Sequence, residues 1–563
     1  MRIQAAILLL AARAFAQTHD HMPPAPASAG IDLAKLPAPQ HIEGIGHSHI
    51  AIATKSAGAQ EWFDQGLALF HCFWDYESLR AFEHAARLDP DCAMCHWGIS
   101  QALYFRGTDN DLAQAELKKA RELSSGASDY EQRLIRAYAD SDEKTGDEAT
   151  RVFNQGMESL INRYPGDIEA KLLFAGRLNG GYDAKGDPRP GALYAQSILR
   201  DILRDQPDNA AANHYMIHAL ENGPHPEAAM ENAQKLVRLA PASGHMVHMP
   251  GHIFYKTGDY ERARQTFLDS LRVDREYMAS QHVSADDDWN FEHNLSYLVA
   301  DCAEAGRYQE ARGYAQELER ALSDPGPLAL FNFNIMQIVD TETRLASRFA
   351  KWDDIIDRPV RFDVPEAELT LATRSYRDGV VDYARGMKAA ESGQGTGAER
   401  YSDALDGMLW RISQEDLKDD AKSARDRVVK LLGVMSLELR GLIAGRKSDL
   451  ESARMLLEQA EQRQKELGST DPPRYSRSPL EVWGDILVRA RKFEDARKVY
   501  RRVLEDRPHS GWALYGIARA WREEGNRAEA MKAFREFLAA WAQADPDLEQ
   551  LKDARAYLAI ANR

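Results

Sequence analysis

Histidines are concentrated in one short stretch of this chain. Eight of its seventeen histidines lie between residues 214 and 293, and only one follows, at position 509. Most of them fall into two groups, which read His214-x3-His218-x2-Glu221 and His245-x2-His248-x3-His252. Neutral imidazole is the commonest metal ligand in proteins, and it also carries protons near neutral pH. The pattern therefore predicts a metal site or a proton-handling site.

The expected ion is a divalent transition metal, with Zn, Cu or Fe as candidates, because imidazole-rich sites suit these metals. Three protein ligands and an open position would lower the pKa of a bound water to about 7 and make it a nucleophile. A redox metal would instead support electron transfer or oxygen chemistry. Glu221 is the candidate catalytic base or a further ligand. No Ser or Cys nucleophile motif and no phosphate-binding Gly loop accompanies the histidines, so no reaction is predicted.

The elements that carry these residues repeat from residue 59 onward. Trp62, Gly66, Phe82, Ala85 and Pro90 have the spacing of the tetratricopeptide repeat, a helix-turn-helix unit of about 34 residues. One such repeat cannot bury its apolar face alone, so neighbours must stack. Because strand signals are nearly absent, we predict an all-α fold, a right-handed superhelical solenoid of tetratricopeptide repeats.

The repeats predict how the chain is divided. Clear repeats are expected at 59–92, 93–126, 210–243, 244–277, 292–325, 477–510 and 511–544, and degenerate helical pairs at 130–209 and 326–470. We predict an N-terminal solenoid (59–325) with the histidine-rich groove, degenerate repeats (326–470) and C-terminal repeats (471–563). The stretches 179–190 and 393–397 are expected to be loops.

The repeat frame places the histidines on one face. Positions 2, 5, 9 and 12 of the first helix carry them and Glu221, counted from repeat starts at residues 210, 244 and 292. Such positions share one stripe of a helix, which in tetratricopeptide proteins lines the concave groove. The candidate metal ligands are His214, His218, His245, His248, His252 and His293. The alternative is a polar groove that binds a peptide or protein partner without metal.

Several residues near this stripe leave the geometry open. Pro250 either kinks the first helix of its repeat or begins it, with His245 and His248 in the preceding loop. His225, between two prolines, is expected in a turn, and His282 in a longer connection that carries the acidic run 286–288.

A second constellation is Cys92-Ala-Met-Cys95-His96, which has the CxxCH spacing of covalent haem c attachment. The repeat frame argues against haem, because Pro90 closes one repeat and Ala93 opens the next. A haem there would displace the interface between the two repeats. The alternatives are helix packing and a bridged or redox-active cysteine pair.

The N-terminus predicts export to a periplasm or outside the cell. Residues 1–16 resemble a signal peptide that ends in Ala-Phe-Ala, and no later apolar run is long enough to span a membrane. Residues 17–58 are expected to be a disordered Pro, Ala and His-containing leader. Its histidines at 41, 47 and 49 either touch the end of the solenoid or form a strap that brings further ligands to the groove. The net charge of −16, without a basic block, argues against nucleic acid as a partner.

The chain resembles a large, poorly characterised group of exported bacterial tetratricopeptide-repeat proteins. The resemblance rests on His47-Ser-His49-Ile, Trp62-Phe-Asp-Gln-Gly-Leu67, Leu88-Asp-Pro-Asp-Cys-Ala-Met94, Ala212-Asn-His-Tyr-x-Ile-His-Ala219 and Gly244-His-x-Val-His-Met-Pro-x-His-Ile253. It implies the solenoid fold and export, and no reaction. In that group Tyr or Trp usually stands where this chain has His96, which further disfavours haem.

Overall fold

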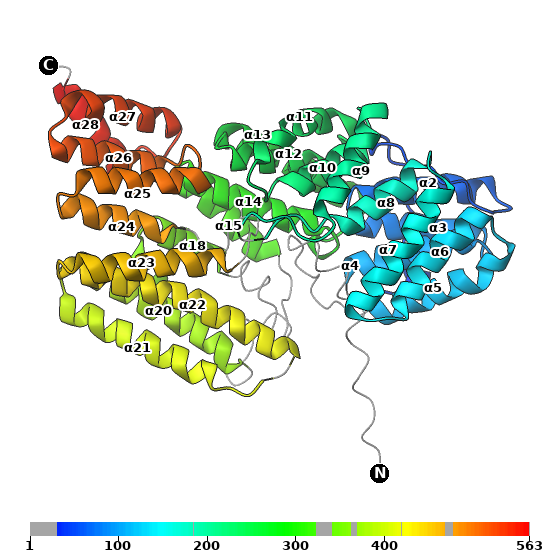
Figure 1. Cartoon of the computed structure of the whole chain (residues 1–563), viewed down its shortest axis with the longest axis horizontal. Coiled ribbons are helices and arrows are strands. Elements are labelled where there is room, and N and C mark those ends of the chain that lie inside the picture. Colours follow the sequence, from blue (N-terminus) through cyan, green and yellow to red (C-terminus); the bar gives the residue numbers. More distant parts are fainter. Residues whose placement is uncertain are drawn as a thin grey trace, which may run out of the picture. The chain divides into compact units, whose positions relative to one another are not determined.

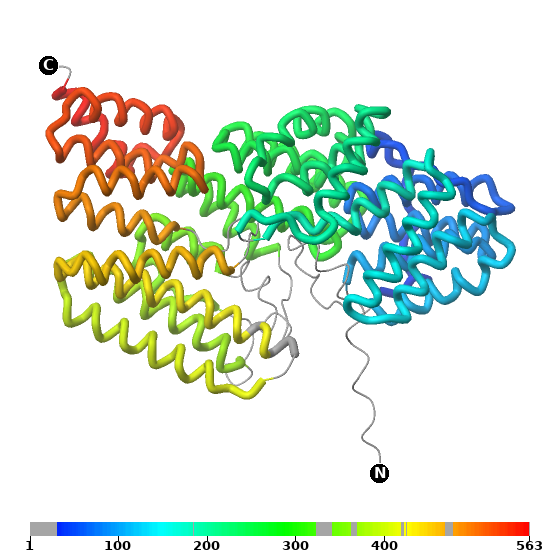
Figure 2. Tube along the Cα trace, in the orientation of Figure 1, coloured from blue at the N-terminus to red at the C-terminus, as the bar shows by residue number. Residues whose placement is uncertain are grey.

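The computed structural model describes residues 31–561, except 108, 184, 322–339, 362–368, 418 and 468–476. These residues form helices joined by short connections, and the β contact among them is one isolated bridge between Tyr182 and Pro188. Successive helices of the described residues pair as antiparallel hairpins, as Figures 1 and 2 show. The predicted all-α class is confirmed.

The chain divides into two compact units. The first comprises the residues up to Ile253 together with Thr266–His293, and the second comprises Phe254–Gln265 and the residues from Asn294 onward. The division falls within three consecutive helices, whereas the sequence predicted domain boundaries at 325 and 470.

The helices up to the division are α2 (Ala57–His71), α3 (Asp75–Leu88), α4 (Ala93–Arg106), α5 (Asn110–Leu123), α6 (Asp129–Asp142), α7 (Gly146–Arg163), α8 (Ile168–Leu178), α9 (Ala192–Asp205), α10 (Ala210–Leu220), α11 (Met230–Leu239), α12 (Gly244–Lys256), α13 (Tyr260–Gln281) and α14 (Trp289–Glu304). Short 3-10 turns are η1 (Leu33–Lys35), η2 (Ser124–Gly126), η3 (Pro226–Ala229) and η4 (Ala285–Asp287).

The later helices are α15 (Tyr308–Ala321), α18 (Thr341–Arg348), α19 (Trp352–Asp357), α20 (Leu371–Glu391), α21 (Gly395–Ser413), α22 (Asp419–Arg446), α23 (Leu450–Lys465), α24 (Pro479–Arg489), α25 (Phe493–Asp506), α26 (Gly511–Glu524), α27 (Arg527–Ala540) and α28 (Glu549–Ala561). Each clear repeat predicted from the sequence holds one helical pair in its described residues.

Small residues let neighbouring helices approach closely, as the repeat pattern requires. Phe82 on α3 is fully buried between Gly66 of α2 and Gly98 of α4. A Cβ atom at Gly98 would lie 2.4 Å from the Phe82 ring, and one at Gly66 would lie 2.7 Å from it. Both glycines are therefore required by packing, because real Cβ contacts are not that short.

The predicted disordered leader is wrong for residues 31–56. This segment runs in extended form along the first repeats, and Leu36, Ile45 and Ile50 are buried. Its backbone is held by side chains of the repeats: Ala53 N–H donates to Glu131 at 2.8 Å, and His49 N–H donates to Glu169 at 3.3 Å. The apolar residues of the segment give it a buried surface that its Pro and Ala content concealed.

Two further predictions concern local structure. The stretch 179–190 is a loop as expected, but α21 begins at Gly395, so only the first residues of 393–397 form a turn, with Gly393 at a φ of 79°. The predicted signal peptide lies outside the described residues. Among the helices that are described, none is long and apolar enough to cross a membrane.

Candidate functional site: two buried histidine clusters

Helix α10 presents the first pair of histidines. It begins after Asn209, whose side chain accepts a hydrogen bond from Ala212 N–H at 2.9 Å and so caps the first turn. His214 and His218, four residues apart, then lie on the same face. Both are buried, with 0% and 8% of their surface exposed.

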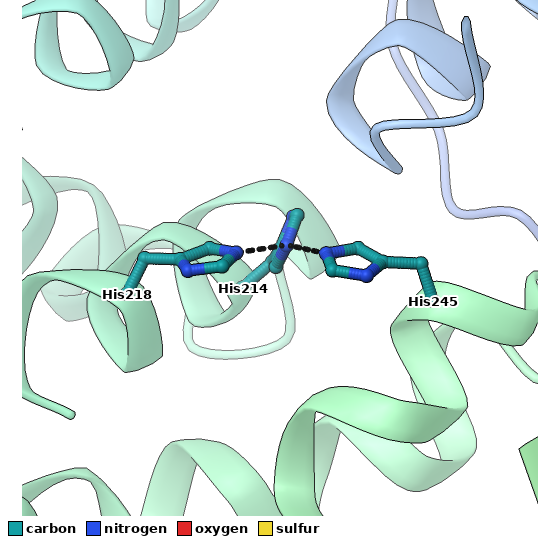
Figure 3. A group of neighbouring side chains, drawn as sticks. All are labelled: His214, His218 and His245. Carbon is teal, nitrogen blue, oxygen red and sulfur yellow. Dashed lines mark hydrogen bonds between the residues drawn. The ribbon is translucent and has the colours of Figure 1, made fainter. Parts of the chain in front are cut away.

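The first cluster consists of His214, His218 and His245. The Nε2 atom of His214 lies 3.0 Å from Nε2 of His218 and 3.1 Å from Nε2 of His245. Figure 3 shows the ring of His214 between the other two, with all three Nε2 atoms converging. Tetrahedral zinc with nitrogen ligands requires N···N separations of about 3.3 Å. The two separations at His214 lie within a few tenths of an ångström of this value, and all three ligand atoms lie within 4.8 Å of one another.

The outer nitrogen of each ring is held by an acceptor. His214 Nδ1 donates to the backbone oxygen of His71 at 2.8 Å. His218 Nδ1 donates to Glu221 at 2.8 Å, and His245 Nδ1 faces the side-chain oxygen of Asn290 at 3.3 Å. With the proton on Nδ1, the Nε2 atom of a neutral ring carries a lone pair. This is the outer-sphere arrangement that orients metal-binding histidines.

The orientation of Asn290 supports this proton placement. Its amide nitrogen donates to Asp274 at 2.8 Å and to Ser270 at 3.3 Å, so its oxygen faces His245. Gly244 makes room for this arrangement, because a Cβ there would lie 1.5 Å from a carboxylate oxygen of Asp274. Burial raises the pKa of Asp274 to about 8.

The second cluster consists of His248, His252 and His293. Their ligand atoms lie within 4.8 Å of one another, and Nε2 of His248 is 2.6 Å from Nε2 of His252. All three side chains are at most 5% exposed. The six histidines predicted to share one site are therefore divided into two groups of three.

Glu221 joins the two clusters. One of its oxygens accepts from His218 of the first cluster, and the other accepts from His252 of the second. Burial would raise the pKa of this carboxyl, but the adjacent His252 and His218 outweigh burial and hold the pKa well below its usual range. Glu221 therefore lies outside the converging Nε2 atoms, in the outer sphere of both clusters, and both oxygens are engaged. This position differs from the ligand or general base predicted from the sequence.

The clusters lie in the protein interior, which corrects the prediction of a groove-facing stripe. Phe73, in the turn between α2 and α3, has its ring centre 4.6 Å from that of His214 and 5.2 Å from that of His218. Trp289 packs against His245 at 4.9 Å and donates its indole N–H to Phe73 O at 3.0 Å. These two aromatic side chains fill the space that the groove would leave open.

Pro250 lies inside α12, so the alternative in which it begins the helix, with His245 and His248 in the preceding loop, is wrong. Gly251 follows it, and a Cβ there would lie 2.3 Å from the Phe267 ring of α13. The three histidines of α12 thus come from a continuous helix, but His245 belongs to one cluster while His248 and His252 belong to the other.

A group of buried carboxyls lies beside the clusters. Burial, followed by repulsion from Asp274 and Asp75, raises the pKa of Asp288 well above its ordinary value. Burial also raises the pKa of Glu292 to about 8 and that of Asp75 to about 6. Part of the acidic run 286–288 is therefore buried, since Asp288 is only 3% exposed.

Cys92, Cys95 and His96 are engaged with protein atoms. The two cysteines form a disulfide at the start of α4. Covalent haem would require both sulfurs for thioether bonds. His96 is buried and its ring nitrogens contact Glu116 at 2.6 Å and the backbone oxygen of Pro90 at 3.1 Å.

The remaining histidines singled out by the sequence lie apart from the clusters. His225 is exposed in a turn and pairs with Glu227 at 3.1 Å. In the N-terminal segment, His49 pairs with Asp64 at 2.8 Å, and His41 stacks on Trp62. This segment is a strap along the repeats.

Sequence reasoning missed the residues that complete the site. His71 supplies its backbone oxygen to His214, and its ring nitrogens contact Tyr215 and Glu169, both at 2.8 Å. Asn290 and Phe73 were missed as well. The positive φ of Phe73, 56°, has no signal in the residue type.

Comparison with known proteins identifies the repeats. Residues 482–545 and residues 246–277 each match a tetratricopeptide-repeat family model. No curated protein matches the chain significantly.

Three similar solved structures are the Cut9–Hcn1 hetero-tetramer of the APC/C, yeast Tom70 and a human IFIT1 dimer. Their sequence identities are 13%, 14% and 13%, and their TM-scores 0.32, 0.26 and 0.31. The alignments cover 90%, 90% and 87% of this chain, and 84%, 95% and 92% of those chains, respectively. The matched segments lie on helical pairs of the kind found along both units, and the chain is therefore an all-α protein folded as tetratricopeptide repeats.

Proposed function

We propose that this chain is a tetratricopeptide-repeat protein that holds transition-metal ions inside its N-terminal unit, one in each histidine cluster. The observation that carries the proposal is the convergence of three Nε2 atoms in the first cluster while acceptors hold the opposite nitrogens. The backbone oxygen of His71 can only accept, so the proton of a neutral His214 must lie on Nδ1.

Lone pairs that face one another in a buried site are unfavourable. Leaving one buried polar atom without a partner costs on the order of 1–3 kcal/mol. A cation at the point of convergence removes that cost and is attracted by the carboxylate of Glu221. Imidazole donors suit Zn, Cu and Fe.

The burial of both histidine clusters indicates a structural role for the ions. All six side chains are at most 8% exposed, so an ion there would contribute its binding free energy to folding, as structural metal sites do. The first cluster has ligands from α10 and α12 and the second from α12 and α14, so the two ions together would connect three successive helical pairs.

Metal analysis of the purified protein tests the proposal. We expect two equivalents of metal in the wild type and one in each of His214→Ala and His248→Ala. His49→Ala, an exposed histidine outside the clusters, is the control and should retain two. A wild type that binds no Zn, Cu or Fe after incubation with each ion would refute the metal function.

A second candidate function is the binding of a protein partner. It is favoured by the repeats themselves, because stacked helical pairs present extended surfaces that commonly bind other chains. Co-purification of a stoichiometric partner that is retained in the His214→Ala variant would support this function separately from metal.

A further inference from the structure

The N-terminal strap, residues 31–56, joins the first hairpin to repeats that follow much later in the sequence. The backbone oxygen of Ile45 accepts a hydrogen bond from the Cys72 thiol at 3.3 Å, and that of Gly44 accepts one from Ala242 N–H at 3.0 Å. Cys72 directly follows α2, whereas Ala242 lies just before α12. One short piece of the strap is therefore bound to both.

These contacts lie within about one helical turn of the first histidine cluster. A Cβ atom at Gly46 would lie 2.9 Å from the Cβ of Ala210, which stands four residues before His214. In the same way, Ala242 stands three residues before His245. The strap therefore borders the cluster at the N-terminal ends of α10 and α12, the two helices that carry its rings.

Ile45 anchors the strap in the protein interior. Its side chain is only 5% exposed, and it belongs to a buried apolar group with Ile217 of α10 and with Met246 and Met249 of α12. Removal of this apolar surface from water favours the docked strap. The anchor thus rests on the same two helices as the rings of the cluster.

A chain of hydrogen bonds also links the strap to the ring of His214. His49 N–H donates to one oxygen of Glu169 at 3.3 Å, and the other oxygen contacts the ring of His71 at 2.8 Å. The backbone oxygen of His71 then accepts from His214 Nδ1 at 2.8 Å. Glu169 is 7% exposed and His71 is 2% exposed. Docking of the strap and orientation of the His214 ring therefore depend on shared buried partners.

The strap is also the neighbour of the cluster that can move at the least cost. Among its described residues, 36–56 contain no helix, so it can leave the repeats without breaking one. Movement of α10 or α12 would instead disrupt the packing of the repeats. His214 and His245 are 0% and 4% exposed, so an ion reaches them only through a local opening of the protein.

We propose that the strap controls the entry and release of the ion in the first cluster, by undocking around Gly44–Gly46. An ion bound in the cluster in turn stabilises the docked strap. The two equilibria are linked, so each favours the other by the same factor. This inference rests on the metal function proposed above and adds its regulation.

Release of Zn²⁺ from the full chain to an excess of chelator tests the proposal. Gly46→Ala should weaken docking, because alanine is disfavoured by a factor of about ten at the left-handed φ of Gly46, 83°, and its Cβ would contact Ala210. In the His248→Ala background, which should retain the ion of the first cluster, release should become about tenfold faster. In the His214→Ala background, which should retain the other ion, release should not change.

Gly186→Ala is the matched control. Gly186 has a φ of 81° in the loop 179–190, and an added Cβ would meet no described residue within 4 Å beyond its chain neighbours. The substitution carries the same backbone penalty away from the strap, so Zn²⁺ release should keep the unsubstituted rate. A thermal melt of each variant confirms that it is folded.

A cross-link tests the opposite change. A Cβ at Gly44 would lie 3.5 Å from the Cβ of Ala242, a separation that a disulfide spans at about 3.5–4.5 Å. Gly44→Cys/Ala242→Cys in the His248→Ala background should hold the strap docked and slow Zn²⁺ release at least about tenfold. Reductant should make release fast again. The His248→Ala protein with the same reductant is the control, because the native disulfide is present in both.

Hydrogen exchange measures the linkage without following the metal. The N–H groups of His49 and Ala53 donate to side chains of the repeats. Their exchange should slow when Zn²⁺ is added to the wild type and should not slow in His214→Ala. Equal exchange with and without Zn²⁺ in the wild type would overturn the linkage.

The release rates decide between the strap and other routes for the ion. Equal release with and without Gly46→Ala, or equal release by the cross-linked and reduced proteins, would overturn the proposal. A wild type that binds no metal would refute the metal function itself. A wild type that binds two ions but fails the release tests would leave that function standing, so the two failures can be told apart.

Discussion

Replacing Glu221 by glutamine should weaken both histidine clusters in one step. The carboxylate accepts from His218 through one oxygen and from His252 through the other. A glutamine side chain has one oxygen and one NH2 group, so it can accept from only one of the two rings. The other ring would face a donor, and it must move its own proton to Nε2, where the metal would bind.

The expected size follows from this geometry. Loss of an outer-sphere partner typically reduces metal affinity by about 10–100-fold. The cluster that keeps the amide oxygen should lose about tenfold, and the cluster that faces the NH2 group should lose about a hundredfold. Together these losses amount to roughly 4 kcal/mol of binding free energy, at about 1.4 kcal/mol for each factor of ten.

Titration with Zn²⁺ against a chelator of known affinity measures both dissociation constants. Glu227→Gln is the matched control, because Glu227 is an exposed carboxylate that pairs with His225 in a turn. The control should bind as the wild type does. If Glu221→Gln leaves both constants within about twofold of wild type, the carboxylate does not serve the clusters. If it changes one constant alone, the link between them is refuted.

Three further outcomes are expected. Gly251→Ala should lower the free energy of unfolding by about 1–3 kcal/mol in urea denaturation, because the added Cβ would lie 2.3 Å from the Phe267 ring. An unchanged urea midpoint would contradict this packing. Burial raises the pKa of Asp274 in the folded protein to about 8, above its ordinary value of 3.8. Its contribution to stability is therefore fully present below pH 4 and is lost as the pH rises to 8. The stability of the wild type relative to Asp274→Asn should therefore fall between about pH 4 and pH 8 by up to about 1.4 kcal/mol per unit and level off above pH 8, and a constant difference would refute the shift. Cys92 and Cys95 form a disulfide, and the other two cysteines are buried. A maleimide should therefore label no cysteine in the native protein, two after denaturation and four after denaturation with reductant. Mass spectrometry counts the labels, and four labels without reductant would disprove the disulfide.

The repeats could be predicted because their signal is local. Gly66 and Phe82 recur at fixed spacing within about 34 residues, and the contact between them is the contact that the fold requires. The same frame placed all six histidines on first helices. Fold class and candidate ligands therefore follow from short-range pattern alone.

The division into two clusters could not be predicted in this way. It depends on whether α12 is continuous through Pro250, where the sequence allowed two alternatives, and on acceptors from distant parts of the chain. His71 lies 143 residues from His214, and Asn290 lies 45 residues from His245, the rings that they hold. Burial of the clusters depends on the backbone of Phe73, which adopts a conformation that is rare for a bulky residue.

The span of the first cluster has a consequence for folding order. Its three rings come from two successive hairpins, and their acceptors come from the first hairpin of the solenoid, from Glu221 at the end of α10 and from α14. In a stack of repeats, each unit otherwise contacts only its neighbours, and ends can open independently. Here the contact of His214 with the backbone oxygen of His71 and the contact of His245 with Asn290 couple distant hairpins. The three Nε2 atoms therefore converge only after this part of the chain has folded. An ion would bind there only when the N-terminal unit is completely folded.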